Sequence, residues 1–204
     1  KLNLRLTGSV NSEEGHISSI SKDDKLLFIE NLARMRQISL ESQWHDADDA
    51  VGWFELERFA NGLRLFKKDR LLIDYTDMLQ MFLERGRAPK LDVMFVDEAQ
   101  DLSPLQWAVV RKLCESADRI YIAGDDDQAI YRWAGADVDY LIRNSKDAMI
   151  LKQSYRVPSS VHTIAQRCIS QVASRVHKIW EPKKETGNVS WEPCLLYTSP
   201  SPRD

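Results

Sequence analysis

The stretch that decides the fold is "LDVMFVDEAQD", Leu91 to Asp101, where a mainly apolar run is followed by a segment carrying three carboxylates. A short apolar run of this kind predicts a strand covered on both faces. Ser103 and Pro104 then supply an N-cap and a first helical residue for "LQWAVVRKLCESA". "RIYIAG", Arg119 to Gly124, is a second apolar strand. Strand, helix and strand in this order predict an α/β fold with a right-handed parallel crossover.

The residues before this unit predict helices. Ser21 to Ile38 has a capping box, Ser21 with Asp24, and one apolar face. A second helix is expected from about Asp48 to Lys68, and "LIDYTDMLQMFLERG", Leu72 to Gly86, is expected to continue helically. The second helix has five apolar residues at helical spacing that are expected in the core. They are Phe54, Leu56, Phe59, Leu63 and Phe66.

Beyond the second strand, the pattern predicts a short helix, a third strand and a further helix. The third strand is "AMILKQSYR", Ala148 to Arg156, and Pro158 opens a helix from Ser159 to His177. The last stretch, "CLLYTSPSPRD" from Cys194 to Asp204, resembles the translation of a sequencing adapter and is expected to be non-native. With no initial methionine either, the sequence is expected to be a fragment of a longer chain.

Composition places the chain among globular proteins. It has 204 residues, 43% hydrophobic and 29% charged, enough for one large domain or parts of two. Without a membrane-length apolar run or a signal peptide, we expect a cytoplasmic protein with no membrane partner. Three scattered cysteines lack metal-ligand spacing. Charge is uneven: residues 1–142 hold 18 basic and 26 acidic side chains, and residues 143–184 hold 9 and 2. The cationic segment fits a phosphate-binding face or, more commonly, a solvated surface.

Acidic and polar residues follow each predicted strand. Because ligands gather at the carboxyl ends of parallel strands, Asp97, Glu98 and Asp125–Asp127 are expected to converge there. Crowded carboxylates need a metal, arginines or water, and their hard oxygens suit Mg²⁺. Glu98 could orient or deprotonate a water, while Gln128 and Arg156 suit a γ-phosphate. The pattern predicts nucleoside triphosphate hydrolysis; acidic loops that merely face solvent are the alternative.

Three longer motifs carry a family resemblance. "VDEAQDLSPLQ", "AGDDDQAIYRWAGA" and "LKQSYRVPSSV" resemble motifs II, III and IV of the UvrD/Rep-like superfamily 1 DNA helicases, in the same order and spacing. "LIDYTDML" resembles the short motif that precedes motif II. The resemblance implies a RecA-like P-loop NTPase fold, incomplete here, with a helical inserted subdomain. It assigns 1–70 to a 1B-like helical insertion, 71–146 to the first lobe (1A), 147–193 to the start of the second lobe (2A), and 194–204 to the adapter-like tail.

The resemblance also implies the nucleotide site, in which ATP and Mg²⁺ lie between the two lobes. Asp97 would bind Mg²⁺ and Glu98 would activate the attacking water. Gln128 would contact the γ-phosphate and couple it to the DNA site. Tyr155 would stack near the adenine, and Arg156 would act as an arginine finger from the second lobe.

The DNA partners implied are single-stranded and duplex DNA, with unwinding from 3′ to 5′. Tyr131 and Trp133 would meet DNA bases, and Arg132 beside them would join this contact. Stacking on aromatic rings tolerates any base, as a translocase requires. Position 134 is alanine where many family members carry arginine, which weakens one DNA contact.

One feature of the family is missing. No G-x-x-x-x-G-K-[ST] loop occurs in the sequence, so the fragment is expected to be inactive alone, although the resemblance implies that its parent is an ATP-dependent DNA helicase. A metal-dependent nuclease using the acidic cluster and a non-catalytic DNA-binding remnant are the alternatives. The sequence does not separate DNA repair from replication, and it leaves the oligomeric state open.

Overall fold

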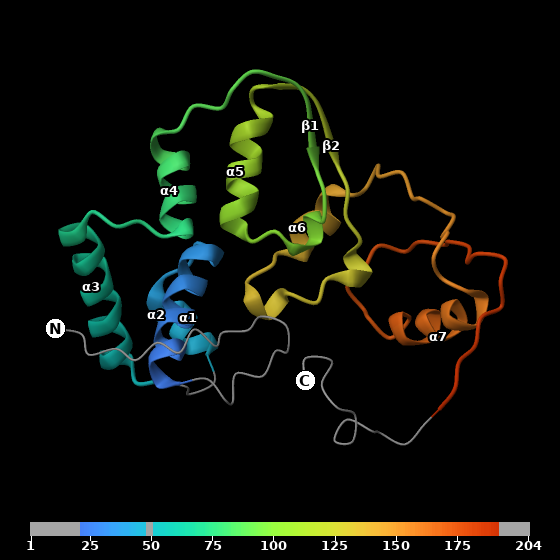
Figure 1. Cartoon of the computed structure of the whole chain (residues 1–204), viewed down its shortest axis with the longest axis horizontal. Helices are drawn as coiled ribbons and strands as arrows, with labels where there is room; N and C mark the ends of the chain where they lie inside the picture. The colour runs from blue at the N-terminus through green and yellow to red at the C-terminus, as the bar shows by residue number, and fades with distance from the viewer. Residues whose placement is uncertain (1–20, 48–50, 192–204) are drawn as a thin grey trace, which may run out of the picture. The chain divides into compact units, whose positions relative to one another are not determined.

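The computed structural model describes residues 21–47 and 51–191. The start of the second predicted helix and the adapter-like tail lie outside the described residues. The chain forms two compact units, one running through Arg143 and the other from Asn144 (Figure 1). The predicted 1–70 and 71–146 segments therefore share one unit up to Arg143.

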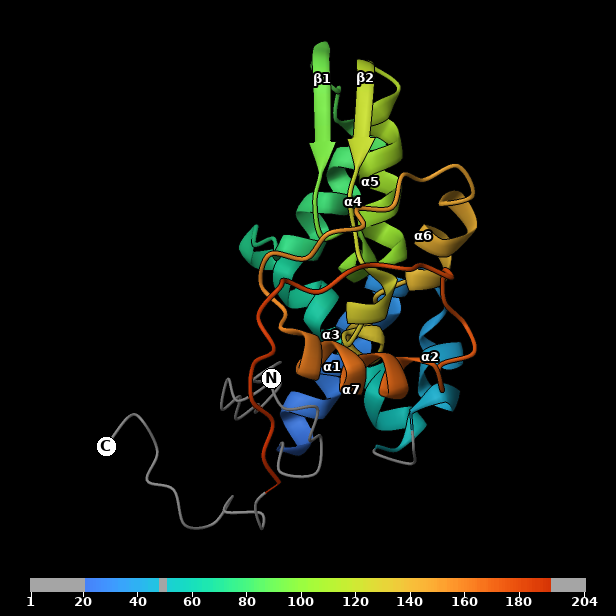
Figure 2. The same cartoon turned by 90° about the vertical axis from the view of Figure 1, so that its right-hand side faces the viewer.

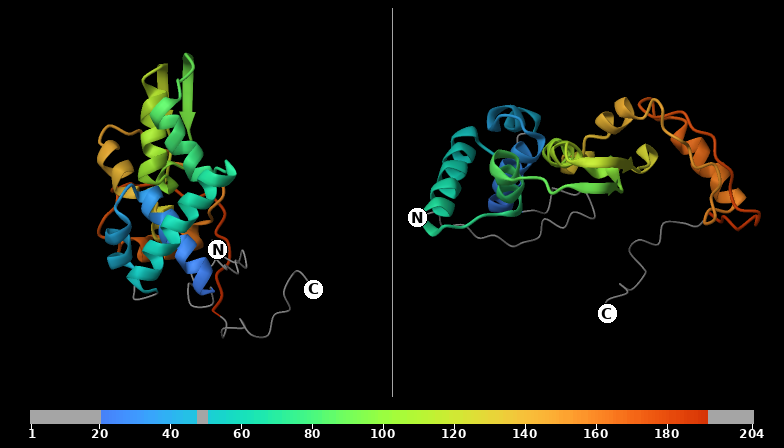
Figure 3. Two further views of the ribbon diagram at one scale, coloured as in Figure 1. Left: turned by 90° about the vertical axis from the view of Figure 1, so that its left-hand side faces the viewer. Right: turned by 90° about the horizontal axis from the view of Figure 1, so that it is seen from above.

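The first unit begins with three helices around a small apolar core. Helix α1 (Lys22–Arg36) starts where the Ser21 side chain accepts the Asp24 N–H at 3.2 Å. The sequence did not predict α2 (Leu40–Asp46), which begins after the Ser39 cap. Helix α3 (Trp53–Arg70) completes the group, and α1 packs against its neighbours (Figure 3). The core consists of Leu26, Ile29, Val51, Leu56 and Phe59.

Two of the aromatic residues predicted for this core are exposed instead. Phe54 is 83% exposed because, at about 100° per residue, it lies opposite Leu56 and Phe59 on α3. Phe66 is 49% exposed, with the Arg70 guanidinium 5.4 Å from its ring centre. The expectation that both belong to the core was wrong.

Helix α4 (Tyr75–Arg85) is separate from α3, so the predicted helical continuation is wrong over its first residues. Leu71 adopts a left-handed conformation that ends α3. Asp74 then starts α4 with a capping box, in which its side chain accepts the Asp77 N–H at 2.7 Å and the Asp77 side chain accepts the Asp74 N–H. The helix starts here because Asp74 satisfies N–H groups that have no partner within the helix.

The strand–helix–strand unit forms as predicted. β1 (Leu91–Val96) and β2 (Ala117–Ile122) run parallel, with Leu91 opposite Ala117 and Val96 opposite Ile122 (Figure 2). Helix α5 (Pro104–Cys114) connects them, starting with a capping box between Ser103 and Gln106. Its Leu105 and Trp107 are buried. The described residues therefore form an α/β fold with a small two-stranded parallel sheet flanked by helices.

The prediction that the first strand is covered on both faces is wrong. Phe95 is 75% exposed and stacks on exposed Tyr121 with ring centres 5.2 Å apart. A continuous apolar run does not by itself tell how many faces are covered, because that depends on which elements pack against the sheet.

The loop after β1 contains the short 3₁₀ helix η2 (Ala99–Asp101). The loop after β2 contains η3 (Asp126–Gln128) and η4 (Arg132–Ala134), and α6 (Val138–Asn144) follows. In the second unit α7 (Ser159–Ile169) starts after Pro158 as predicted, but it ends well before His177.

The predicted third strand is absent from the described residues. Its segment makes only an isolated parallel bridge between Gln153 and Glu181. Met149 and Leu151 before it are exposed. A strand needs a neighbour along its length, and here the backbone pairing is confined to a few bonds such as that from the Ser154 N–H to the Glu181 carbonyl, 2.8 Å.

In the described part of the chain, none of the helices has both the length and the apolar character needed to cross a membrane.

Candidate nucleotide and DNA site

The parallel register brings the two acidic loops together at the carboxyl ends of the strands. The Ala123 N–H donates to the Val96 carbonyl at 2.8 Å, and the Ala99 N–H donates to the Ala123 carbonyl at 3.0 Å. Backbone pairing thus continues one step beyond the strands. "VDEAQD" and "GDDDQ" therefore leave the sheet side by side.

Asp97 and Glu98 are both exposed where β1 ends. The Asp97 carboxylate accepts the Glu98 N–H at 2.9 Å. Glu98 has φ 50° and ψ 40°, a left-handed conformation that costs a side-chain-bearing residue roughly 1–2 kcal/mol. Backbone strain of this kind persists where the surrounding structure enforces it, as is common at functional sites.

Gln100, which the sequence reading did not single out, joins the two loops. Its side chain is buried, with 2% exposed. Its Nε2 donates to Glu98 Oε2 at 2.7 Å, and its Oε1 accepts the Asp125 N–H at 3.0 Å. The signal that could have revealed it is an amide two residues after a pair of carboxylates and shortly before a helix start.

The second loop is held by its own side chains. Asp125 Oδ1 accepts the Asp127 N–H at 3.2 Å, which starts η3. Gln128 is exposed, and its Nε2 donates to Asp125 Oδ2 at 2.6 Å. The side chain proposed to sense the γ-phosphate is therefore tied to the strand end rather than loose in solvent.

Asp101 is a further carboxylate of the first loop, and it is half-buried beside Gln100. Burial raises the pKa of its carboxyl, and the neighbouring Glu98 charge raises it further. The hydrogen bond from Gln100 acts in the opposite direction. Asp101 is half-buried, whereas Glu98 is exposed at the strand end, so Glu98 is the better candidate for the carboxylate that acts on a reacting water.

The three residues assigned to DNA lie on the next turn. Arg132 is exposed and pairs with Asp139 through two hydrogen bonds of 3.2 and 3.1 Å. Trp133 is half-buried and stacks on Phe28 of α1, with ring centres 6.2 Å apart and 25° between the planes. Tyr131 is half-buried at the start of η4. Trp133 is thus neither wholly core nor wholly exposed.

Tyr155 and Arg156 belong to the second unit. Tyr155 is 86% exposed, and Arg156 is exposed as well. The Ser154 hydroxyl oxygen accepts the N–H groups of Arg156 at 3.4 Å and Val157 at 3.1 Å, which shapes the turn before α7.

The metal-binding expectation rests on a single carboxylate. Within the described ranges, no three His, Cys, Asp or Glu side chains are grouped to hold a metal ion. Asp97, exposed at the strand end, fits the way Mg²⁺ is usually bound, through one or two carboxylates together with waters and substrate phosphates.

Comparison with known proteins identifies the family. The model of the UvrD/REP helicase N-terminal domain matches residues 13–149. The chain belongs to the UvrD/Rep helicase family. DNA helicase II of Salmonella typhimurium is 33% identical over 139 residues, which is 65% of this chain and 18% of that protein. The ATP-dependent DNA helicase PcrA of Bacillus subtilis is 32% identical over 108 residues, 50% of this chain and 15% of PcrA. The chain thus spans less than a fifth of these curated relatives.

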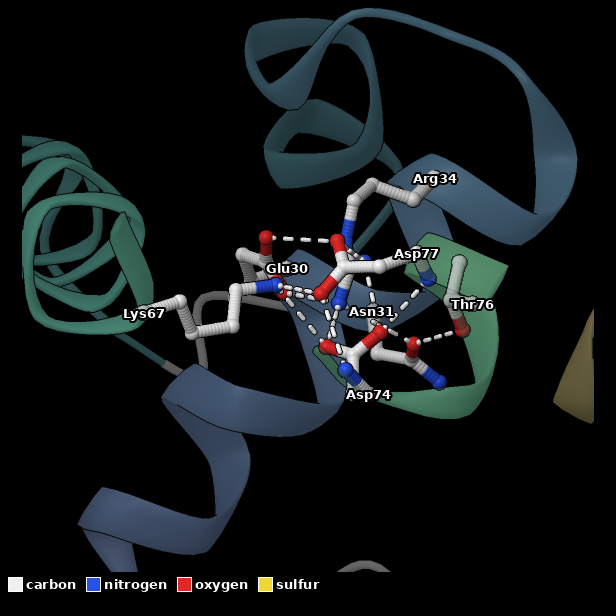
Figure 4. Close-up of polar contacts among 7 residues, drawn as sticks. All are labelled: Glu30, Asn31, Arg34, Lys67, Asp74, Thr76 and Asp77. Atoms are coloured by element: carbon white, nitrogen blue, oxygen red, sulfur yellow. Dashed lines mark hydrogen bonds and ion pairs between the residues drawn. The ribbon is translucent and has the colours of Figure 1, made fainter. Parts of the chain in front are cut away.

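In this UvrD/Rep family chain, the segment 72–79, which resembles the short motif before motif II, contributes Asp74 and Asp77 to an ionic cluster (Figure 4). Arg34 of α1 binds Asp74 at 2.7 Å and Asp77 at 3.1 Å. Lys67 of α3 binds the same two carboxylates at 2.9 and 2.6 Å. Around this centre Arg34 also binds Glu30, at 2.9 Å. The motif therefore joins α1, α3 and α4 in this chain.

Proposed function

We propose that this chain is the central part of an ATP-dependent DNA helicase that couples Mg-ATP hydrolysis to movement along single-stranded DNA, unwinding duplexes from 3′ to 5′. Membership of the UvrD/Rep family and the names of its helicase relatives support the class. One observation carries the proposal for the site. The loops of Glu98 and Gln128 are joined at the end of a parallel sheet, where a water-activating carboxylate and a γ-phosphate contact would be needed together.

The residue roles are part of the same proposal. Asp97 would hold Mg²⁺, which supplies positive charge to the phosphates, and Glu98 would accept a proton from the attacking water. Gln128 would contact the γ-phosphate, and Tyr155 and Arg156 would complete the ATP site from the second lobe. Tyr131, Arg132 and Trp133 would contact DNA. A carboxylate, an amide and an arginine are the groups that phosphoryl transfer to water requires.

The proposed organisation follows the family. Residues 1–70 would be the 1B-like insertion, 71–146 the end of a RecA-like first lobe, and 147–193 the start of a second lobe. The observed division at Arg143 and Asn144 lies close to the proposed lobe boundary. We place the protein in the cytoplasm as part of this proposal.

A chimera tests the function. Residues 13–149 would replace the matching segment of B. subtilis PcrA, and DNA-stimulated ATP hydrolysis and duplex unwinding would be measured. We expect both activities to be retained and to be lost on Glu98→Gln. Asp92→Asn is the matched control, since Asp92 is exposed on the same strand outside the loops. A folded chimera that binds ATP and DNA but does not unwind would refute the proposal. Cleavage of DNA with metal alone would favour the nuclease.

A further inference from the structure

Gln100 is one of the few polar side chains in the buried part of the first unit, and both ends of its amide are used. A buried amide without partners is strongly destabilising, so its bonds are specific requirements of the site. Its Nε2 faces carboxylates, Glu98 at 2.7 Å and Asp101 at 3.4 Å, which can only accept when ionised. Its Oε1 faces the Asp125 N–H, which can only donate. The partners therefore fix the orientation of the amide.

Four side chains and one backbone N–H form a continuous path that includes the Gln100 amide. Glu98 and Asp125 belong to different loops, and Gln100 hydrogen-bonds to both. Asp125 in turn accepts the Gln128 side-chain amide at 2.6 Å. Three hydrogen bonds therefore connect the Glu98 carboxylate to the Gln128 side chain.

Gly124 allows this contact. A Cβ at position 124 would lie 2.9 Å from Gln100 Oε1 and 3.2 Å from the Gln100 backbone nitrogen. Any larger residue would push the amide away from the Asp125 N–H. The close approach of the two loops depends on the absence of a side chain here.

We propose that Gln100 is a positioning residue that holds the Glu98 carboxylate and the 125–128 loop in one arrangement and transmits changes between them. It supports the strained Glu98 conformation from the side chain, while the Ala99–Ala123 bond supports it from the backbone. The catalytic meaning of this link rests on the proposed function, but the link itself is a property of the 204-residue chain.

A double-mutant cycle followed by NMR tests the link in that chain. The readouts are the backbone amide of Asp125 and the side-chain amide of Gln128. Glu98→Gln removes the charge that polarises Gln100, so we expect it to shift both resonances. In a Gln100→Met background the same substitution is expected to leave them unmoved. Asp97→Asn removes a neighbouring charge with no bond to Gln100, and it measures the shift due to the electric field alone.

Two controls separate positioning from folding. Gln43→Met removes a similarly buried amide that accepts from Arg36, and it should lower stability without moving the Asp125 resonance. If Gln100→Met does not fold, Gly124→Ala takes its place in the cycle, because it displaces the amide and keeps the residue. A Glu98→Gln shift that survives loss of the Gln100 contact, or that Asp97→Asn reproduces in full, overturns the proposal.

The catalytic consequence is measured in the PcrA chimera. Gln100→Glu keeps the shape but places a carboxylate against Glu98. We expect kcat to fall by about 10–100-fold, the range for residues that orient a reacting group, with little change in KM for ATP. Equal changes in kcat and KM would contradict positioning. An inactive parent chimera would refute the helicase proposal but leave the NMR result valid.

Discussion

Asp97 and Glu98 are neighbours in the chain, but we expect their substitution to affect different steps, nucleotide binding for Asp97 and hydrolysis for Glu98. In the chimera, Glu98→Gln should leave ATP binding nearly intact and slow hydrolysis by about a hundredfold or more, the usual scale for a lost general base. Asp97→Asn should weaken Mg²⁺-dependent nucleotide binding, because it removes the carboxylate proposed to bind Mg²⁺. Fluorescent-nucleotide titrations beside single-turnover hydrolysis measure the two effects. Equal loss of nucleotide affinity in both variants would contradict the division of roles.

Trp133 has one stacking partner inside the protein and is proposed to have another in DNA. Trp133→Ala should cost roughly 1–3 kcal/mol of single-stranded DNA affinity with little base preference, the range for one stacked base. Fluorescence titration with oligonucleotides at fixed salt measures this loss. Phe28→Leu is the control, since it removes the ring on which Trp133 stacks and leaves Trp133 in place. If both variants bind DNA like the unchanged chimera, Trp133 is a structural residue.

At the scale of elements, the ionic cluster predicts how the helices are held together. Asp74→Ala removes the cap of α4 and the bonds from Arg34 and Lys67. We expect a loss of about 1–3 kcal/mol in the free energy of unfolding, from a lost N-cap and charged hydrogen bonds. Urea unfolding of the 204-residue chain measures it. Asp69→Ala, at an exposed position near the end of α3, should change little, and a similar loss there would contradict a specific role.

The same cluster predicts a pH dependence. Burial alone would raise the pKa of Asp74, but hydrogen bonds from Arg34, the Asp77 N–H and Lys67 lower it overall. Its folded-state pKa therefore lies below the unfolded value, and ionised Asp74 stabilises the fold above that unfolded value, about 4. We expect this contribution to be lost as pH falls below about 4. Asp74→Asn should flatten this part of the stability profile, and an unchanged profile would contradict the assignment.

At the scale of the whole molecule, we expect the 204-residue chain alone to hydrolyse no ATP above background. The sequence has no G-x-x-x-x-G-K-[ST] loop, so it lacks the backbone N–H groups and the lysine that cradle the β- and γ-phosphates. A phosphate-release assay with and without single-stranded DNA measures this. DNA-stimulated turnover that Glu98→Gln abolishes would contradict the prediction and show that another segment holds the phosphates.

The sequence by itself determined the features that depend on residues close together in the chain. Ser21 and Ser103 cap their helices through N–H groups three residues ahead, and these short-range bonds can be predicted from spacing. The β1–α5–β2 order and the carboxylates at its strand ends were equally evident. Because parallel strands end at one edge, this pattern also predicted that the loops of Glu98 and Gln128 would meet.

Only the tertiary structure decided the features that depend on packing between distant segments. Gln100 is buried because two loops close over it, and Phe54 and Phe95 are exposed because no described element covers them. Residues 148–156 are not a strand because they find no continuous neighbour. Trp133 stacks on Phe28, which lies on a helix about a hundred residues away. Burial and strand pairing are relations between segments, so local periodicity shows which residues can take part but not which partners they meet.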